Sequence, residues 1–313
     1  VYPQYFPKQN TELEAYQQIE KDLLDAVLYA PDNTPGNKTL FSKSVARTLL
    51  AKIYAEKPLR DYTKVIQYCD EVKADGFDLV DDFSDLFGMN AAGTDAKMRN
   101  TKESILEAQF TSGAGNWCTW MFGRDLVNWN NNFTWAKWVT PSRDLISAFK
   151  QEGDEVRFKE SIVYYDCNWS NYYPSDNYPF MYKCRSANSS IIKYRYADVL
   201  LLKAEALIMQ DTPDLEGAAD IIDEVRDRAK LGALPTSVRS NKNVLLNALL
   251  KERRLELAFE GQRWFDLVRL DKVEEVMNAV YAKDSGRKAQ IYTFDKNSYR
   301  CLLYTSPSPR DRG

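Results

Sequence analysis

Apolar residues recur every three or four positions along most of the N-terminal quarter of the chain. Residues 11–29 carry this pattern and follow two good N-cap candidates, Asn10 and Thr11. Residues 42–56 and 60–74 repeat it, with small alanines at positions suited to helix crossings. These stretches predict three consecutive helices, joined by turns rich in Asp, Asn, Pro and Gly.

The same spacing returns in the C-terminal third of the chain. Residues 193–210 and 215–230 predict a second helix pair, and 242–270 predict one long helix that closes the stack. Paired helices of this length resemble tetratricopeptide repeats, whose period is about 34 residues. Such units bury their apolar faces only by stacking, so a terminal unit is expected to leave a face uncovered. The inward positions of the second helix are expected to be Ala218, Ile221, Ile222 and Val225.

The C-terminal half of the long predicted helix combines charged and aromatic side chains. We expect Gly261 inside this helix, where another element packs close, at a cost of about 1 kcal/mol relative to Ala. Arg253 is spaced to pair with Glu256 along the helix surface, and Glu260 is spaced in the same way to pair with Arg263. Ion pairing and packing explain these charges better than a catalytic cluster does. One apolar face is expected to hold Leu246, Leu250, Leu257, Gly261, Trp264, Phe265 and Val268.

The middle of the chain, residues 111–190, differs from the predicted helices in its amino-acid composition. It holds six of the seven Trp residues with many Asn and Tyr, at spacings that do not fit a helix. A pyranose packs its apolar face on Trp and Tyr rings, and its hydroxyls hydrogen bond to amides and a guanidinium. The composition predicts a glycan-binding insert; rings that fill the core of a loop-rich insert are the alternative. The residues expected to bind the ligand are Trp117, Trp120, Trp129, Trp135, Asn128, Asn130 and Arg124, with Arg143 as a second source of a guanidinium.

Composition narrows the function classes. A net charge of −3 disfavours nucleic acid as a partner, because phosphate binding needs concentrated Lys and Arg. No apolar run reaches the roughly 18 residues that a membrane span needs. The chain has no His, which removes Ser-His-Asp and Cys-His catalysis and His-ligated metal sites, and it has no glycine-rich phosphate loop. We therefore expect neither a metal nor a cofactor.

Carboxylates and cysteines leave two smaller questions open. The carboxylates near the aromatic region resemble an acid–base pair, but we expect them on a solvated surface. None of the cysteines shows a zinc-type C-x-x-C spacing. A disulfide among Cys118, Cys167 and Cys184 stays open beside free or buried thiols. The carboxylates concerned are Asp125, Asp144, Asp154 and Glu155.

Four segments match, in order, the signatures of one known family. They are KESILEAQF at 102–110, TPSRDLISAFKQEGDEVRF at 140–158, IIKYRYADVLLLKAEALIMQ at 191–210 and KERRLELAFEGQRWFDLVRL at 251–270. Together they resemble the SusD-like (RagB/SusD) family, the glycan-capturing lipoproteins of the Bacteroidota outer membrane. The resemblance covers most of residues 10–300.

The resemblance implies a mainly α fold, with tetratricopeptide-type helical repeats, an irregular aromatic-rich insert and a few short strands. It implies a helical repeat region at 1–100, the ligand-binding insert at 101–190 and a C-terminal helical repeat region with the family signature at 191–300, together one SusD-like domain. It also implies non-catalytic glycan binding at the cell surface and delivery to a SusC-like TonB-dependent outer-membrane transporter. Ligand residues vary within the family, so the binding residues given above rest on composition.

Both ends of the chain suggest a fragment. Residues 301–311, CLLYTSPSPRD, resemble a translated sequencing-library adapter, so we expect 301–313 to be a non-native tail. Val1 is not Met, and no signal peptide follows it, so we expect an N-terminally truncated protein. In a family member the missing part would carry a lipid anchor, the expected means of membrane attachment.

Two other functions stay open. A helical-repeat scaffold for protein partners predicts a concave apolar or charged helical face and no use for the Trp and Asn residues. An α-helical glycoside hydrolase predicts two carboxylates about 5 Å or 6.5–9.5 Å apart across an aromatic cleft. The family resemblance supports neither, and we expect no enzymatic activity.

Overall fold

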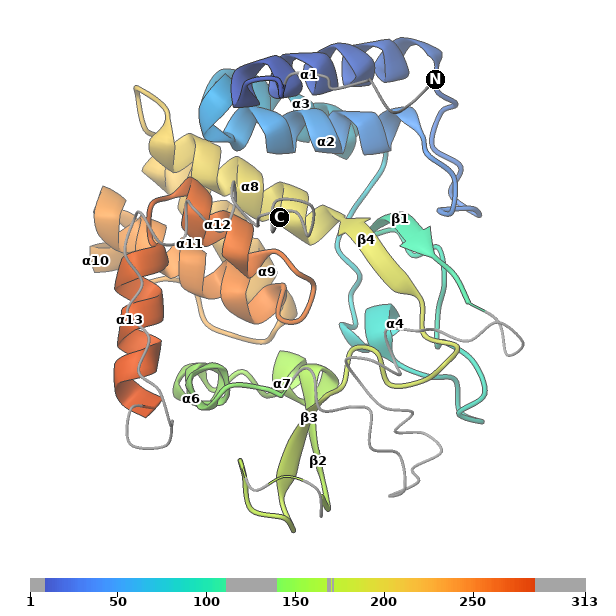
Figure 1. The fold of residues 1–313 in the computed structure, drawn as a ribbon, viewed down its shortest axis with the longest axis vertical. Helices are drawn as coiled ribbons and strands as arrows, with labels where there is room; N and C mark the ends of the chain where they lie inside the picture. The colour runs from blue at the N-terminus through green and yellow to red at the C-terminus, as the bar shows by residue number, and fades with distance from the viewer. Residues whose placement is uncertain (1–8, 111–139, 168–169, 171, 285–313) are drawn as a thin grey trace, which may run out of the picture. The chain divides into compact units, whose positions relative to one another are not determined.

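The computed structural model describes residues 9–110, 140–167, 170 and 172–284. Within them the fold is mainly helical with two small antiparallel sheets, which confirms the predicted fold class (Figure 1). The chain separates into two compact units, residues 1–260 and 261–313, and each is described by itself. No helix among the described residues is both long and apolar enough to cross a bilayer.

Three N-terminal helices form where the apolar pattern predicts them. Thr11 begins the first with a capping box: its Oγ1 accepts the N–H of Glu14 at 3.2 Å, and the Glu14 carboxylate accepts the N–H of Thr11 at 2.8 Å. Asp61 caps the third by accepting the N–H of Lys64. The second helix packs against both of the others (Figure 1). The three are α1 (Glu12–Tyr29), α2 (Lys43–Ala55) and α3 (Tyr62–Ala74).

Helix α8 (Tyr196–Met209) lies at the centre of the core. Side chains around its whole circumference are buried, because it packs against α3, α9 (Leu215–Arg228) and α11 (Lys242–Glu256). In α9 the predicted inward residues Ala218, Ile222 and Val225 are fully buried, and Ile221 is partly buried against the same core. The prediction of a second packed helix pair is therefore confirmed.

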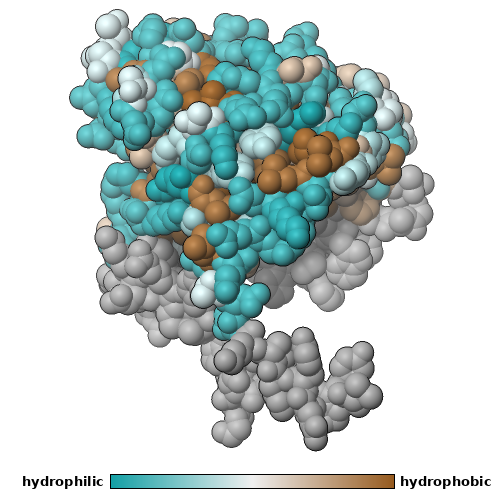
Figure 2. Space-filling model, turned by 90° about the horizontal axis from the view of Figure 1, so that it is seen from above, coloured by the Kyte–Doolittle hydropathy of each residue, from teal (hydrophilic) through white to brown (hydrophobic). Residues whose placement is uncertain are grey.

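Helix α1 leaves apolar side chains on the surface. Leu28 is 67% exposed, and Leu13 and Leu24 on the same side of the helix are 46% and 40% exposed. Figure 2, which looks onto this end of the molecule, shows brown hydrophobic patches among the teal hydrophilic residues. A helix at the end of a stack lacks a neighbour on one side, and the expected uncovered face is present here.

Two antiparallel strand pairs organise the middle of the first unit. β1 (Ser104–Ala108) pairs with β4 (Ile191–Arg195) and so joins segments that are distant in sequence. β2 (Ile162–Tyr165) pairs with β3 (Tyr178–Met181) in a regular register from Ile162–Met181 to Tyr165–Tyr178. Because β4 runs directly into α8, the stretch 193–210 that was predicted to be helical begins as a strand. The remaining short elements of this unit are η1 (Lys57–Leu59), α4 (Ser84–Phe87), α6 (Arg143–Glu152), α7 (Glu155–Ser161) and α10 (Thr236–Arg239).

The predicted single helix over 242–270 is wrong, because the chain turns after α11. Phe259 and Gly261 adopt left-handed backbone, with φ of 66° and 78°. The predicted apolar face therefore does not continue past Leu257. Among the described residues, no atom lies within 4 Å of the position that a Cβ at Gly261 would occupy, so this glycine permits a positive φ and not a close approach. The second unit contains α12 (Arg263–Arg269) and α13 (Val273–Asp284).

Replacing Gly261 by Ala is expected to lower the free energy of unfolding by about 1–2 kcal/mol, because an L side chain is strained in the left-handed region. Gly36→Ala is the matched control, since Gly36 has open space around it and no positive φ. Urea unfolding followed by circular dichroism measures both variants. Equal stabilities of the two variants would contradict this role for Gly261.

Candidate functional site

Charged side chains gather inside the first unit where α7, β4, α9 and α11 meet. We call this group the ionic cluster. Its arginines and carboxylates come from segments spread over much of the unit, and nearly all of them are buried. The members are Glu103, Asp154, Arg157, Lys183, Arg195, Arg228, Glu252, Glu256 and Glu260.

Glu256, the last residue of α11, is the centre of the ionic cluster and is fully buried. Its Oε1 accepts hydrogen bonds from Arg195 Nη1 at 2.5 Å and from Arg228 Nη2. Its Oε2 accepts from Arg157 Nη1 at 3.0 Å. Burial alone would raise the pKa of Glu256, but these three arginines hold it well below its usual range. A carboxylate held ionised in this way is a poor proton acceptor, so its role is structural.

Glu260 extends the ionic cluster beyond the end of α11. Its carboxylate accepts from Arg195 Nε at 2.7 Å and from Lys183 Nζ at 2.6 Å. Lys183 also donates to the main-chain carbonyl of Glu256 at 2.9 Å. The left-handed Phe259 turns the chain between these two glutamates, and both then contact Arg195. The sequence pattern did not reveal this break in the helix. The break places both glutamates within hydrogen-bond distance of Arg195.

The predicted pairing of Arg253 with Glu256 along a helix surface is wrong. Arg253 is 1% exposed, and its Nη2 donates to Asp198 of α8 at 2.7 Å. Asp198 also accepts from Lys52 of α2 at 2.7 Å. Intrahelical spacing suggested the wrong partner, because α11 buries this face against neighbouring helices. The broader interpretation, that ion pairing and packing explain these charges, agrees with the contacts.

The carboxylates near the aromatic region are less solvated than expected. Asp154 is 1% exposed, because it caps α7 and pairs with Arg157 Nε at 2.5 Å. Asp144 pairs with an arginine of α11 at 2.7 Å. Glu155 is exposed, and Asp125 lies outside the described residues. Among the residues that the structure describes, no cluster of three or more His, Cys, Asp or Glu side chains is arranged to hold a metal ion.

All seven residues predicted to bind the ligand fall within 111–139, outside the described residues. The exposure of Trp117, Trp120, Trp129 and Trp135, and the roles of Asn128, Asn130 and Arg124, therefore stay predictions. Cys118 lies in the same range, whereas Cys167 is a buried free thiol.

A tyrosine-rich hairpin, β2 and β3 with the residues that connect them, follows that segment in the chain. The guanidinium of Arg143 lies 4.1 Å and 4.4 Å from the ring centres of Tyr172 and Tyr173. The rings of Tyr173 and Tyr178 meet edge to face at 5.5 Å, and Tyr178 is 2% exposed. Here the rings form a small core, as the alternative interpretation expected, and Arg143 packs within it.

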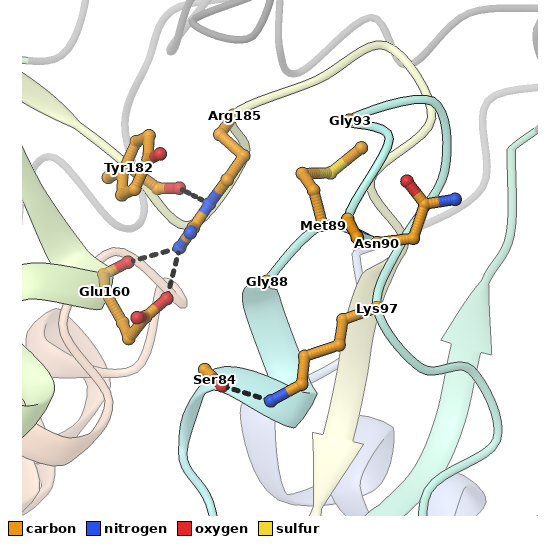
Figure 3. A pocket seen from close by; sticks show the side chains of 10 residues that line it. Ser84, Gly88, Met89, Asn90, Gly93, Lys97, Glu160, Tyr182 and Arg185 are labelled. Atoms are coloured by element: carbon orange, nitrogen blue, oxygen red, sulfur yellow. Dashed lines mark hydrogen bonds and ion pairs between the residues drawn. The ribbon is translucent and has the colours of Figure 1, made fainter.

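A pocket of about 400 Å³ lies next to the ionic cluster and the hairpin. It is lined in part by α7 and by the residues after β3, which also contribute to the ionic cluster. This volume lies in the range of small-molecule sites, roughly 300–1,000 Å³. Figure 3 shows Arg185, Tyr182 and Glu160 on one side of it and Met89 on the other, with Asn90 next to Met89 and its amide turned away from Arg185. The lining combines the loop after α4, the end of α7 and the residues after β3. No motif marks these segments, and the sequence pattern did not predict the pocket.

Comparisons with known proteins identify a family model, sequence relatives and solved structures that are similar to parts of this chain. Residues 175–302 match the model of the SusD family. The SusD-like protein P38 of Formosa agariphila is 43% identical over 99 residues, which are 30% of this chain and 19% of the relative. A SusD homolog from Bacteroides thetaiotaomicron has a TM-score of 0.70 at 21% identity, covering 95% of this chain and 66% of that one. A laminarin-binding SusD-like protein has a TM-score of 0.64 at 25% identity, covering 89% and 64%. The chain thus spans under two thirds of this last structure and matches about a fifth of the curated relative.

Replacing Glu256 by Gln is expected to lower the free energy of unfolding by roughly 3–5 kcal/mol, because three buried arginines lose their shared counter-charge. Glu155→Gln, the same substitution at an exposed position of α7, is expected to change it by less than about 0.5 kcal/mol. Guanidinium unfolding of both variants decides the point. A Glu256→Gln variant as stable as the parent would show that Glu256 does not hold the helices together.

Asp198 is expected to make stability depend on acid pH. Burial raises its pKa, but Lys52 and Arg253 outweigh burial, so the folded pKa lies below the usual value of about 3.9. Its contribution is then complete above pH of about 4 and is lost as the pH falls towards the folded pKa. The stability difference between the parent and Asp198→Asn should therefore shrink from pH 5 to pH 2.5 in urea titrations. A difference that stays constant over this range would argue against the depressed pKa.

Proposed function

We propose that this chain, a SusD-like protein, binds glycans without transforming them. The observation that carries the proposal is the match of residues 175–302 to the SusD family model. One similar structure is described as a laminarin-binding SusD-like protein, which supports a glycan as the ligand class. Because the chain spans only part of its relatives, the ligand of the whole protein is part of the proposal.

The aromatic-rich segment supports a sugar ligand by its chemistry. Trp rings offer flat apolar faces that carry negative charge density, and the polarised C–H groups of a pyranose pack on them. Asn side chains and Arg124 supply donors and acceptors for the hydroxyls. Rings lose little conformational entropy on binding, which suits reversible capture. We keep Trp117, Trp120, Trp129 and Trp135 as the proposed stacking residues, with Asn128 and Asn130 beside them.

A non-catalytic role is supported by the state of the buried Glu256. Three arginines hold this carboxylate ionised. It is therefore not placed as a general acid, which needs a proton to give at neutral pH. The chain also lacks the His that most nucleophilic hydrolases use as a base.

The cellular role follows from the family. We propose that the protein is a surface lipoprotein of the outer membrane, attached by a lipid on a preceding segment. We further propose that it delivers its glycan to a SusC-like TonB-dependent transporter. Such a role favours weak and reversible binding, because the ligand has to be released to the partner.

Affinity electrophoresis of the chain in gels that contain single soluble polysaccharides tests the proposal. At least one neutral plant, algal or microbial polysaccharide is expected to retard the parent. A Trp117/Trp120/Trp129→Ala variant is expected to lose most of that retardation, because each lost stacking contact removes about 1 kcal/mol or more. Tyr29→Ala, which removes an 82% exposed ring from α1, is the control and should migrate like the parent.

A reducing-end assay on the same mixtures separates binding from hydrolysis. Release of new reducing ends by the parent would contradict a non-catalytic role. If no polysaccharide retards a chain that is folded by circular dichroism, glycan binding by this chain is wrong.

A further inference from the structure

We propose that the pocket between the α4 loop, α7 and the residues after β3 is a second sugar subsite, which takes one neutral, hydroxyl-rich pyranose unit. The proposal rests on the proposed glycan binding, but it concerns a different part of the chain from the Trp-rich segment. All ten residues that line the pocket are described by the structure. Its volume of about 400 Å³ suits one or two sugar units rather than a long chain.

The strongest feature of the pocket is a fixed donor beside a fixed acceptor. Arg185 donates from Nε to the carbonyl of Tyr182 at 2.8 Å and from Nη2 to the carbonyl and Oε2 of Glu160, both at 2.9 Å. These bonds hold the guanidinium in place, and its third nitrogen, Nη1, takes part in none of them. Within the described part of the chain, neither Nη1 of Arg185 nor Oε1 of Glu160 has a hydrogen-bond partner, and neither atom is sealed from solvent.

Such a pair is suited to the hydroxyls of a sugar. A hydroxyl accepts one hydrogen bond and donates another, so neighbouring hydroxyls can accept from Nη1 and donate to Oε1 together. Both groups are charged, which makes each bond about twice as strong as a neutral one. Arg185 is 5% exposed and Glu160 is 9% exposed, so bulk water competes little with a ligand there.

The charges around the pocket disfavour an anionic sugar. The ammonium of Lys97 donates to Ser84 Oγ at 2.6 Å and pairs with Asp82 at 3.0 Å and Asp85 at 2.7 Å. Its three N–H groups are therefore occupied, and two carboxylates balance its one charge. The Arg185 charge is balanced by Glu160. A uronate or sulfate would meet Glu160 at a site whose cations are already balanced by carboxylates, whereas a neutral sugar avoids this repulsion.

The wall of the pocket opposite Arg185 carries one large apolar side chain, and its loop is held by hydrogen bonds. Met89 faces the cavity and offers a flexible apolar contact for the C–H face of a sugar (Figure 3). The loop that carries it is closed by a Met89–Ala96 bridge and by the N–H of Lys97 donating to Gly88 at 2.8 Å. Asn188 Nδ2 donates to the carbonyl of Thr94 at 2.7 Å and so holds the tip of this loop in place. A preformed wall lowers the entropic cost of binding.

Saturation-transfer NMR and calorimetry on the full chain test the subsite. The probes are glucose, galactose and mannose, their β-linked disaccharides, and glucuronate and galacturonate. Ala91→Trp places a large side chain on an exposed lining residue, and Ala92→Trp places the same side chain on the next exposed residue, which does not line the pocket. We expect a neutral sugar to bind the parent and Ala92→Trp equally, and at least tenfold more weakly to Ala91→Trp. The matching uronate should bind the parent at least tenfold more weakly than the neutral sugar.

Two further variants separate this proposal from the Trp-rich site. Trp117/Trp120/Trp129→Ala should keep the sugar binding that Ala91→Trp loses, even where it loses retardation by polysaccharide. Glu160→Gln keeps the size of the side chain and should weaken neutral sugars while relieving the discrimination against the uronate. Binding unaffected by Ala91→Trp, a uronate bound as tightly as the neutral sugar, or no sugar bound by the parent overturns the subsite. Polysaccharide retardation that needs the Trp residues would in that case still support the proposed function.

Discussion

The buried carboxylate of Glu256 is the interaction on which the rest of the first unit depends. Three arginines donate to it: Arg157 from α7, Arg195 from the end of β4 and Arg228 from the end of α9. Each of these elements follows a different loop, and the carboxylate sets the point at which they meet. Helix packing alone permits sliding along ridges and grooves, whereas directional hydrogen bonds to one carboxylate allow a single arrangement.

Burying charged groups between helices has a free-energy cost. Removing charges from water costs several kcal/mol for each ion, and the pairing returns this only if every charge finds its partners. In the ionic cluster, Glu260 provides Arg195 with a second carboxylate besides that of Glu256, and Lys183 donates to Glu260. The result is specificity of arrangement, because any displaced helix would leave a charge buried without a partner.

The ionic cluster and the pocket use residues of the same short segments. On α7, Arg157 donates into the ionic cluster, and Glu160, about one turn later, lines the pocket. After β3, Lys183 donates into the ionic cluster, and Arg185, two residues later, lines the pocket. A network that fixes the backbone of these segments also fixes Glu160 and Arg185, which line the cavity. The proposed subsite would therefore take its rigidity from the core beside it.

Local pattern by itself determined the helices that begin with a cap and carry one apolar face. Thr11 predicted a helix start that the structure has, because capping and apolar periodicity act within a few residues. The four motif segments likewise predicted the resemblance to the SusD family, and residues 175–302 match the model of that family. Tertiary structure alone decided the break after Glu256, since the two glutamates on either side of Phe259, Glu256 and Glu260, both contact Arg195. It also decided the partner of Arg253 and the pocket around Arg185. Those contacts join residues that are far apart in the chain, and residue spacing within one segment carries no information about which distant charge will lie opposite.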